Sequence, residues 1–313
     1  TAETGSTVAV YANGVELGNA TESSTTAGSF SYTSSSALVD GNYSVYATST
    51  DTAGNTAEST AQDIIIDTVD PDLPTISSAS LSNSAAPTLT GTAEVGSTVT
   101  VVVTGSSTGA TYTTTATDGN WSIDTSSTAD LDSGTLALNA NGSNTVSVTS
   151  TDAAGNASAA ASQTLTLDTT DATVSASTDK ADGSYTVGEE IDITLTFDES
   201  VTLSGSAGLN ITLQDGSSTT VATLNVTAAE LNGVSTVTKT YTVAAGDTAG
   251  DLTVSGVALG TSATLQDDAG NDADLSSLTA TVGTSDAIVI DTTAPAAADV
   301  NAVTNNNNFA ENS

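Results

Sequence analysis

Apolar and polar residues alternate along most of the chain in short runs that end at glycine, asparagine or aspartate. Two such runs are STVTVVVTG (97–105) and EIDITLTF (190–197). A period of two is the pattern of a β-strand with one buried face, and the residues that end the runs favour turns. No helical period is sustained over three turns, although ADLSSL (273–278) is compatible with a single turn. The pattern therefore predicts an all-β protein.

The stretch 75–168 shows how the strands are spaced. Seven short strand signals in about 100 residues are typical of an immunoglobulin-like β-sandwich. Trp121 is then expected in the core of that sandwich. The signals are TISSASL (75–81), PTLTGT (87–92), STVTVVVTG (97–105), ATYTTTAT (110–117), WSIDT (121–125), NTVSVTS (144–150) and SQTLTLD (162–168).

Internal repeats divide the chain. TAETGSTVAVYANG (1–14) matches TAEVGSTVTVVVTG (92–105), and TDTAGN (50–55) returns as TDAAGN (151–156) and QDDAGN (266–271). Repeats of this length indicate a tandem array. The repeats close on IIIDTVDP (64–71), LTLDTTDA (165–172) and IVIDTTAP (288–295). We therefore expect a partial repeat at 1–69 that lacks its first strands, a complete repeat at 70–169, a longer repeat of a second type at 170–293, and the linker and first strand of a following repeat at 294–313.

The composition narrows the possible functions. The 313 residues include 37 acidic residues and two lysines, with no arginine, histidine or cysteine, so the net charge is −35. Such a charge repels nucleic acid and anionic membranes and favours cationic partners. No apolar run approaches the roughly 20 residues of a membrane span, so membrane insertion is not expected. Catalytic bases, nucleophiles and phosphate clamps mostly use residues that are scarce here, so no enzyme is predicted.

The acidic residues gather near the ends of the repeats. The last strand of a sandwich runs the length of the domain, so the AGN turn and the following IDT motif lie at opposite ends, about 35 to 40 Å apart at strand rise. Each AGN turn is then expected to meet the linker of the preceding repeat. The first predicted site comprises Asp67, Asp70, Asp72, Glu94, Asp152 and Asn156, and the second comprises Asp168, Asp171, Asp198, Glu199, Asp267, Asp268 and Asn271.

Three further ligand candidates lie outside these two sites. Asp51 and Asn55 form the first copy of the turn, and their partners would belong to an upstream repeat. Asp291 ends the third repeat. It lies 20 residues after the asparagine of the AGN turn, Asn271, whereas the corresponding spacing in the other two repeats is 12 residues. The linker that follows Asp291 also lacks a second acidic residue. A downstream site at Asp291 is accordingly the weakest of those predicted.

Crowded carboxylates repel one another unless they are protonated, separated or bound to a cation. Oxygen ligands without histidine or cysteine suit calcium better than zinc or copper, and flexible oxygen ligands suit it better than magnesium. We therefore expect Ca²⁺ as the cofactor. The alternative is that these aspartates serve turns only, through hydrogen bonds to their own backbone.

Several motifs resemble those of a known family. The D-x-A-G-N turn, the I-D-T-x-x-P junction and the T-A-E-x-G-S-T-V strand start resemble the bacterial Ig-like repeats of giant secreted surface adhesins, which include RTX-type and biofilm-associated proteins. YTVGEEIDITLTFDESV (185–201) resembles a second repeat type of similar proteins. The resemblance implies tandem Ig-like domains in an extended extracellular rod, with calcium at the domain junctions and a role in surface attachment or biofilm cohesion.

Two other functions stay open at this point. Thr1 aligns with Thr92, so the first repeat lacks the equivalents of residues 75–91, and residues 296–313 are as long as 75–92. The chain is thus either a window of a longer protein or a filament subunit whose tail pairs with the open first repeat of an identical subunit. A glycan-binding module is the other alternative. The expected partners are neighbouring repeats or identical subunits, with surface glycans or proteins as further candidates.

Overall fold

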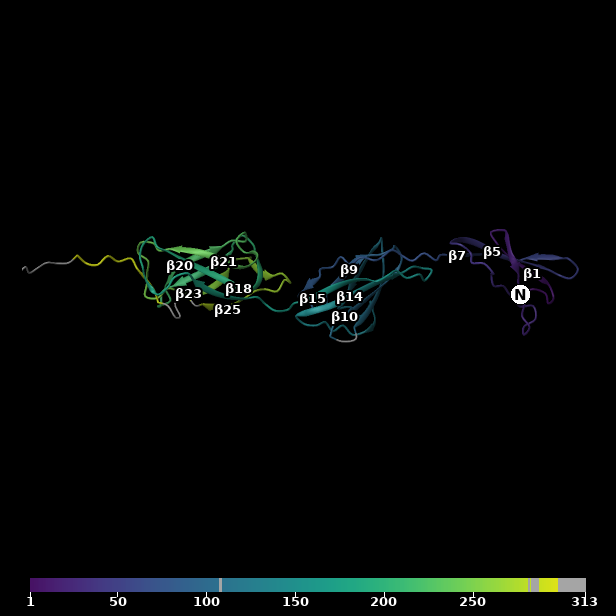
Figure 1. Cartoon of the computed structure of the whole chain (residues 1–313), viewed down its shortest axis with the longest axis horizontal. Coiled ribbons are helices and arrows are strands. Elements are labelled where there is room, and N and C mark those ends of the chain that lie inside the picture. Colours follow the sequence, from purple (N-terminus) through teal and green to yellow (C-terminus); the bar gives the residue numbers. More distant parts are fainter. Residues whose placement is uncertain (107–108, 281, 283–286, 298–313) are drawn as a thin grey trace, which may run out of the picture. The chain divides into compact units, whose positions relative to one another are not determined.

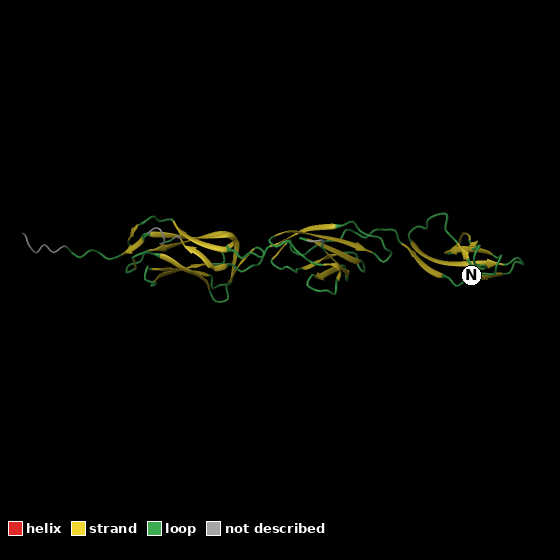
Figure 2. Ribbon diagram, turned by 90° about the horizontal axis from the view of Figure 1, so that it is seen from below, coloured by secondary structure: helices red, strands yellow, loops and turns green. Residues whose placement is uncertain are grey.

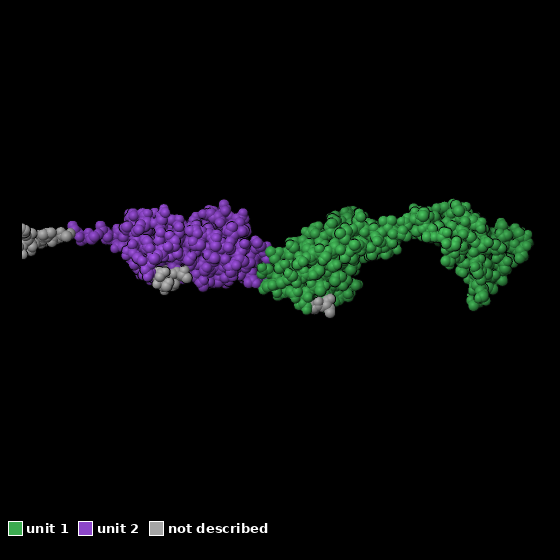
Figure 3. Space-filling view, viewed as in Figure 1, with its two compact units in different colours: residues 1–168 green, residues 169–313 purple. Residues whose placement is uncertain are grey.

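The computed structural model describes residues 1–106, 109–280, 282 and 287–297, and all regular elements in this part of the chain are strands (Figure 2). The all-β prediction is confirmed. The chain divides into two compact units, Thr1–Asp168 and Thr169–Ser313 (Figure 3). No helix long and apolar enough to cross a membrane occurs in the described ranges.

The first repeat is built around one sheet. β1 lies between β2 and β5, and both β6 and β7 pair with β5. β1, β5 and β7 are labelled in Figure 1. β3 and β4 form a separate two-stranded pair. On β1, Val8 and Ala12 are buried, as the alternation predicts. The strands are β1 (Thr7–Ala12), β2 (Val15–Asn19), β3 (Thr21–Glu22), β4 (Phe30–Ser31), β5 (Gly41–Thr50), β6 (Thr56–Glu58) and β7 (Gln62–Ile66).

The second repeat has two sheets. One has the order β13-β11-β10-β14-β15-β8, and the other pairs β12 with β9. The core contains Val99, Val101 and Val103 of β10 together with Leu89 of β9. The strands are β8 (Leu81–Ser82), β9 (Thr88–Thr92), β10 (Thr98–Thr104), β11 (Ala110–Thr115), β12 (Asn120–Asp124), β13 (Leu131–Gly134), β14 (Gly142–Thr151) and β15 (Ala161–Leu167). All seven strand signals correspond to strands, but β8 is shorter than its signal. β13 was missed because LDSG shows no apolar alternation.

Trp121 is a core residue, as expected, with 3% of its surface exposed. Its indole Nε1 donates hydrogen bonds to the carbonyls of Thr75 (3.2 Å) and Thr92 (3.3 Å). Gly91 lies against the ring, and a Cβ there would come within 2.6 Å of it. The indole thus ties the first residues of the second repeat to its core.

The third repeat has three sheets around a separate core. Their orders are β21-β18-β16-β25 with β24 also paired to β18, β17-β26-β22, and β20-β19-β23. The strands are β16 (Thr173–Thr178), β17 (Gly183–Tyr185), β18 (Glu190–Ser204), β19 (Leu209–Gln214), β20 (Thr220–Val226), β21 (Asn232–Thr242), β22 (Thr248–Ala249), β23 (Thr253–Leu259), β24 (Thr264–Asp267), β25 (Asp274–Ala280) and β26 (Ile288–Asp291).

Two features of the third repeat bear on the sequence predictions. The helical turn considered for ADLSSL is wrong, because this segment is β25, which pairs in parallel with β16. The long strand β18 changes partner along its length: Phe197 pairs with Val174 of β16, and Val201 pairs with Asp267 of β24. Residues 198–200 lie at this change of partner, which places Asp198 and Glu199 beside the end of β24.

The cores are distributed unevenly. Among the described residues, one buried apolar cluster is made by the second repeat and one by the third, and residues 1–69 contribute to neither. The repeat boundaries at 69, 169 and 293 remain a prediction, since the two compact units do not separate the first two repeats. Most of the predicted segment 294–313 lies outside the described residues.

Candidate metal centre and linker contacts

Each AGN turn is closed by the aspartate that precedes it. Asp152 Oδ1 accepts hydrogen bonds from the backbone N–H of Gly155 (2.7 Å) and Asn156 (2.9 Å), and its Oδ2 accepts one from Asn156 Nδ2 (2.8 Å). Asp267 makes the same contacts with Gly270 and Asn271. The turn role considered for these aspartates is therefore real, because carboxylates readily accept backbone N–H bonds in such turns.

The first copy of the turn has the same form. Asp51 accepts from the N–H of Ala53 and Asn55 (both 2.8 Å) and from Asn55 Nδ2 (2.7 Å). The side-chain hydrogen bond from Asn55 lowers the pKa of Asp51, and that from Asn156 lowers the pKa of Asp152, because these bonds favour the charged carboxylate.

The asparagine of the turn also holds a linker. Asn156 Nδ2 donates to the carbonyl of Asp67 (3.1 Å), and Asn271 Nδ2 donates to the carbonyl of Thr170 (3.3 Å). The sequence predicted both asparagines as metal ligands, which would use the side-chain oxygen. The amide nitrogen is instead used for a direct protein contact, which leaves the role of the oxygen untested.

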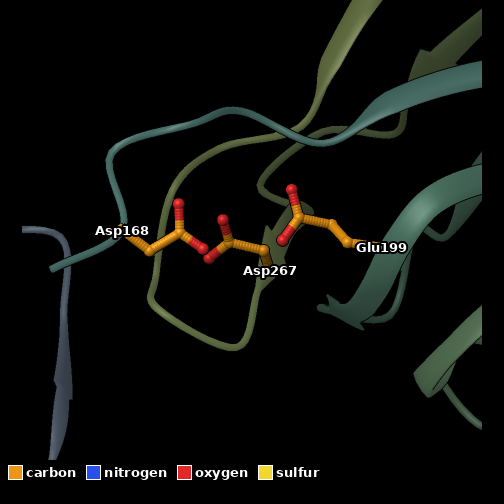
Figure 4. Close-up of side chains that lie close together, drawn as sticks. All are labelled: Asp168, Glu199 and Asp267. Atoms are coloured by element: carbon orange, nitrogen blue, oxygen red, sulfur yellow. The ribbon is translucent and has the colours of Figure 1, made fainter. Parts of the chain in front are cut away.

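One group of predicted ligands comes together as closely as a metal site requires. The carboxylates of Asp168, Glu199 and Asp267 each offer an oxygen, and these oxygens lie within 4.8 Å of one another (Figure 4). Asp267 ends β24, Glu199 lies where β18 changes partner, and Asp168 immediately precedes the first residue of the second unit. Asp267 is buried, with 6% of its surface exposed.

No basic side chain is available to balance this group. Lys180 Nζ lies 2.9 Å from Asp179, and Lys239 Nζ lies 2.8 Å from Glu230. The sequence contains no other lysine and no arginine or histidine. The two oxygens of Asp267 are held by hydrogen bonds from Gly270 and Asn271, and the three carboxylates together could hold a cation. Three carboxylates without nitrogen or sulfur ligands fit Ca²⁺, with waters or carbonyls completing its six to eight ligands.

Other residues predicted for the second site lie apart from this group. Asp198 accepts from the N–H and the hydroxyl of Thr173 (both 2.7 Å), and the hydroxyl bond is the main cause of its lowered pKa. Asp198 thereby holds the start of β16. Asp171 and Asp268 are exposed and do not belong to the close group.

The residues predicted for the first site do not form such a group in the described part of the chain. None of Asp67, Asp70, Asp72, Glu94 and Asp152 belongs to a set of three or more closely spaced ligand atoms. Asp67 Oδ1 accepts from the N–H of Val69 (3.1 Å). Asp291, at the end of β26, likewise accepts from the N–H of Thr293 (2.9 Å).

Sequence reasoning missed Asp40. Its Oδ1 accepts from the N–H (3.1 Å) and the hydroxyl (2.9 Å) of Thr68, in the linker after β7. Asp40 precedes a glycine, and such a pair favours a turn. Its contact with a linker 28 positions later could not be inferred from local pattern.

The model of the bacterial Ig-like domain matches residues 1–68 and 75–169, which together make up just over half of the chain. The chain belongs to this family. None of the curated proteins compared matches the chain.

Solved structures resemble these Ig-like domains at low identity. A 1.5-MDa bacterial ice-binding adhesin matches with 21% identity and a TM-score of 0.36, over 92% of this chain and 87% of that one. The fibronectin(III)-like modules of Clostridium thermocellum CbhA match with 16% identity and a TM-score of 0.33, over 54% and 81%. The FN1–FN3 domains of chicken CNTN1 match with 13% identity and a TM-score of 0.24, over 83% and 87%.

Proposed function

We propose that this chain is a stalk segment of an extracellular bacterial adhesin, in which Ca²⁺ stiffens the linkers between Ig-like domains. Membership of the bacterial Ig-like family and the tandem order of the repeats support a spacer role. The stalk would hold an adhesive region away from the cell and serve surface attachment or biofilm cohesion. This role needs no catalytic residues.

The observation that carries the calcium part is the group formed by Asp168, Glu199 and Asp267. Its oxygens lie within 4.8 Å of one another, and both lysines of the chain are paired elsewhere. Extracellular calcium modules typically bind with a Kd of about 10⁻⁴ to 10⁻³ M. At 10 mM Ca²⁺, such a site would stabilise the fold by roughly 1.4 to 2.7 kcal/mol.

The mechanical effect follows from where the ligands lie in the sequence. Asp168 belongs to the linker, while Glu199 and Asp267 belong to strands of the third repeat. An ion held by all three fixes the linker to the strands, in addition to the bond from Asn271 to the Thr170 carbonyl. We extend the proposal to the first predicted site, where Ca²⁺ would draw Asp67, Asp70, Asp72, Glu94 and Asp152 together.

The direct test is calorimetric titration of the whole chain with CaCl2 and, separately, with MgCl2, together with thermal unfolding in 10 mM CaCl2 and in EDTA. Calcium is expected to bind more tightly than magnesium and to raise the Tm of the third repeat. Glu199→Gln should weaken calcium binding at least tenfold. Asp268→Asn removes the same charge from the loop that carries Asp267 and is the matched control, with little effect expected.

Solution scattering tests the stiffening separately. Calcium is expected to increase the maximum dimension of the chain and to narrow its distribution. Unchanged Tm and unchanged binding heats would remove calcium from the proposal. A raised Tm with an unchanged maximum dimension would keep the calcium site but eliminate its mechanical role.

A further inference from the structure

Two tyrosines of the first repeat stack on each other. Tyr11 of β1 lies directly opposite Tyr46 of β5 in the antiparallel register of the two strands. Their ring centroids are 5.1 Å apart, and their ring planes are inclined by 7°. Both side chains are half-buried. Directly opposite residues on neighbouring strands have closely spaced Cβ atoms, so strand pairing itself holds the two phenol rings together.

The pair lies on the outward face of the sheet. Val8 and Ala12 of β1 are buried, and Tyr11 lies on the opposite face of the strand, because successive side chains alternate. In the second repeat, the corresponding residues are Val102 and Ser147, which also lie directly opposite each other. The fold of an Ig-like repeat therefore does not require aromatic residues at these two positions.

The hydroxyl groups distinguish this pair from the other tyrosines. In the described part of the chain, neither the Tyr11 nor the Tyr46 hydroxyl has a hydrogen-bond partner, whereas the other five of the seven tyrosines donate to a protein oxygen. The donors and acceptors are Tyr32 and Leu17, Tyr43 and Val39, Tyr112 and Thr125, Tyr185 and Ala181, and Tyr241 and Asp247. An internal hydrogen bond therefore does not explain why both positions carry tyrosine rather than phenylalanine. The two phenol groups remain available for reaction.

Phenol rings held this close can be joined by oxidation. Removal of one electron and one proton from each hydroxyl gives two phenoxyl radicals, whose unpaired electrons are shared with the ring carbons next to the C–O carbon. Two such carbons form a C–C bond, and the hydrogen atoms on them move to the oxygens, which restores both phenols. The product, dityrosine, has two hydrogen atoms fewer than the two tyrosines. The sequence contains no cysteine, so no disulfide can supply a cross-link of this kind.

We propose that Tyr11 and Tyr46 form an oxidative cross-linking site, at which a dityrosine bond joins β1 to β5. The oxidant is hydrogen peroxide acting through a haem peroxidase. One molecule of peroxide accepts the two electrons and two protons that the phenols lose and becomes two molecules of water. The rings couple within one chain because they are already stacked before oxidation.

The bond has a mechanical consequence for the first repeat. β1 and β5 pair along their length, from Thr7 opposite Thr50 to Ala12 opposite Val45. A covalent bond between the side chains of Tyr11 and Tyr46 keeps the two strands together when this pairing breaks. It also closes a loop in the unfolded chain, which lowers the conformational entropy of that state as a disulfide does. The cross-link thus stabilises the first repeat without calcium and is independent of the ion proposed above.

The test treats the whole chain, in dilute solution with EDTA, with a haem peroxidase and hydrogen peroxide, followed by digestion and mass spectrometry. The expected product is a linked pair of peptides that contain Tyr11 and Tyr46, two hydrogen atoms lighter than the separate peptides, together with dityrosine fluorescence and a raised Tm of the first repeat. Tyr11→Phe and Tyr46→Phe should each lower this fluorescence at least fivefold. The matched control is Tyr43→Phe, which should leave it unchanged, because Tyr43 lies on the same strand but its hydroxyl donates to the carbonyl of Val39.

Three results would overturn the proposal. One is the absence of the linked peptide pair while the enzyme oxidises free tyrosine in the same solution. Another is an equal yield of dityrosine from Tyr11→Phe and from the parent chain, because the coupling would then involve other tyrosines. The third is a cross-link found only in covalent dimers on a denaturing gel, because the reaction would then join separate chains.

Discussion

The side-chain amide of Asn156 donates a 3.1 Å hydrogen bond to the backbone carbonyl of Asp67, 89 positions earlier in the chain. Asn271 does the same to Thr170, 101 positions earlier. In both cases, the asparagine side chain of the turn contacts a backbone carbonyl of the linker. A linker of any sequence has such carbonyls. The turns TDAAGN and QDDAGN can therefore make the same contact with linkers of different sequence, DTVDP and DTTDA.

Asn156→Ala is expected to lower the free energy of unfolding of the second repeat by about 1 kcal/mol, mainly through loss of the bond to the Asp67 carbonyl. Urea unfolding followed by the fluorescence of Trp121, the sole tryptophan, reports on this repeat. The matched control is Asn55→Ala, which removes the same turn residue from the first repeat and should leave the Trp121 transition unchanged. An equal shift in both variants would contradict a local linker contact.

Trp121→Ala is expected to lower the free energy of unfolding of the second repeat by about 3 to 5 kcal/mol, because it removes a large side chain that is 3% exposed. Trp121→Phe should cost less, about 1 to 3 kcal/mol, because the ring is partly retained while the carbonyls of Thr75 and Thr92 lose their donor. Circular dichroism in urea measures both. Phenylalanine is the natural comparison because Phe30 occupies the equivalent position in the first repeat. If Trp121→Phe destabilised the repeat as much as Trp121→Ala, loss of the indole N–H bonds, which both variants share, would outweigh burial of the ring.

Glu199→Gln is expected to have opposite effects with and without calcium. In EDTA it should raise the Tm of the third repeat, because it relieves repulsion from Asp168 and Asp267. In 10 mM CaCl2 it should lower the Tm relative to the parent chain, because the ion loses a ligand. Differential scanning calorimetry at pH 7 in both buffers checks the reversal. A change of the same sign in both buffers would count against the carboxylate group as a cation site.

Asp198→Asn should lower the free energy of unfolding of the third repeat by about 1 kcal/mol, both in EDTA and in calcium. The two carboxylate oxygens of Asp198 accept the bonds from the N–H and the hydroxyl of Thr173, whereas asparagine has one side-chain oxygen and carries no charge. Urea unfolding in EDTA and in calcium measures the effect. Asp198 and Glu199 are neighbours in the sequence. Comparing Asp198→Asn with Glu199→Gln therefore distinguishes a carboxylate with a structural role from one proposed to bind the metal. Calcium dependence of the Asp198→Asn effect would contradict this separation.

The ion pair of Glu230 and Lys239 predicts a pH dependence. The hydrogen bond from the Lys239 ammonium, followed by those from Thr227, lowers the pKa of Glu230 from 4.5 to about 2. A carboxylate with a lowered pKa in the folded state stabilises the protein above its unfolded pKa, and the contribution disappears as pH falls from about 4.5 to about 2. The stability difference between the parent chain and Glu230→Gln should shrink over this interval, as measured by urea unfolding at several pH values. A difference that is constant with pH would contradict the assignment.

Local pattern was sufficient for most of the strands and for the repeated turns. Alternation over STVTVVVTG predicted β10, with Val99, Val101 and Val103 facing inward, because a strand with one buried face has a period of two. The repeated Asp-x-Ala-Gly-Asn motif predicted the turns, since glycine takes the left-handed conformation there and aspartate accepts the backbone N–H groups. The interpretation of ADLSSL as a possible helical turn was wrong because local pattern carries no signal of the parallel pairing of β25 with β16, which is a long-range contact.

The sequence by itself determined which residues carry charge and how often the turns recur. Only the tertiary structure decided which acids meet. Asp168, Glu199 and Asp267 lie far apart in the sequence and come together because β18 changes partner at residues 198–200 and β24 ends beside it. Asp198, one residue from Glu199, accepts a hydrogen bond from the hydroxyl of Thr173 instead. The sequence gives the number of carboxylates, but the pairing of the strands determines the distances between them.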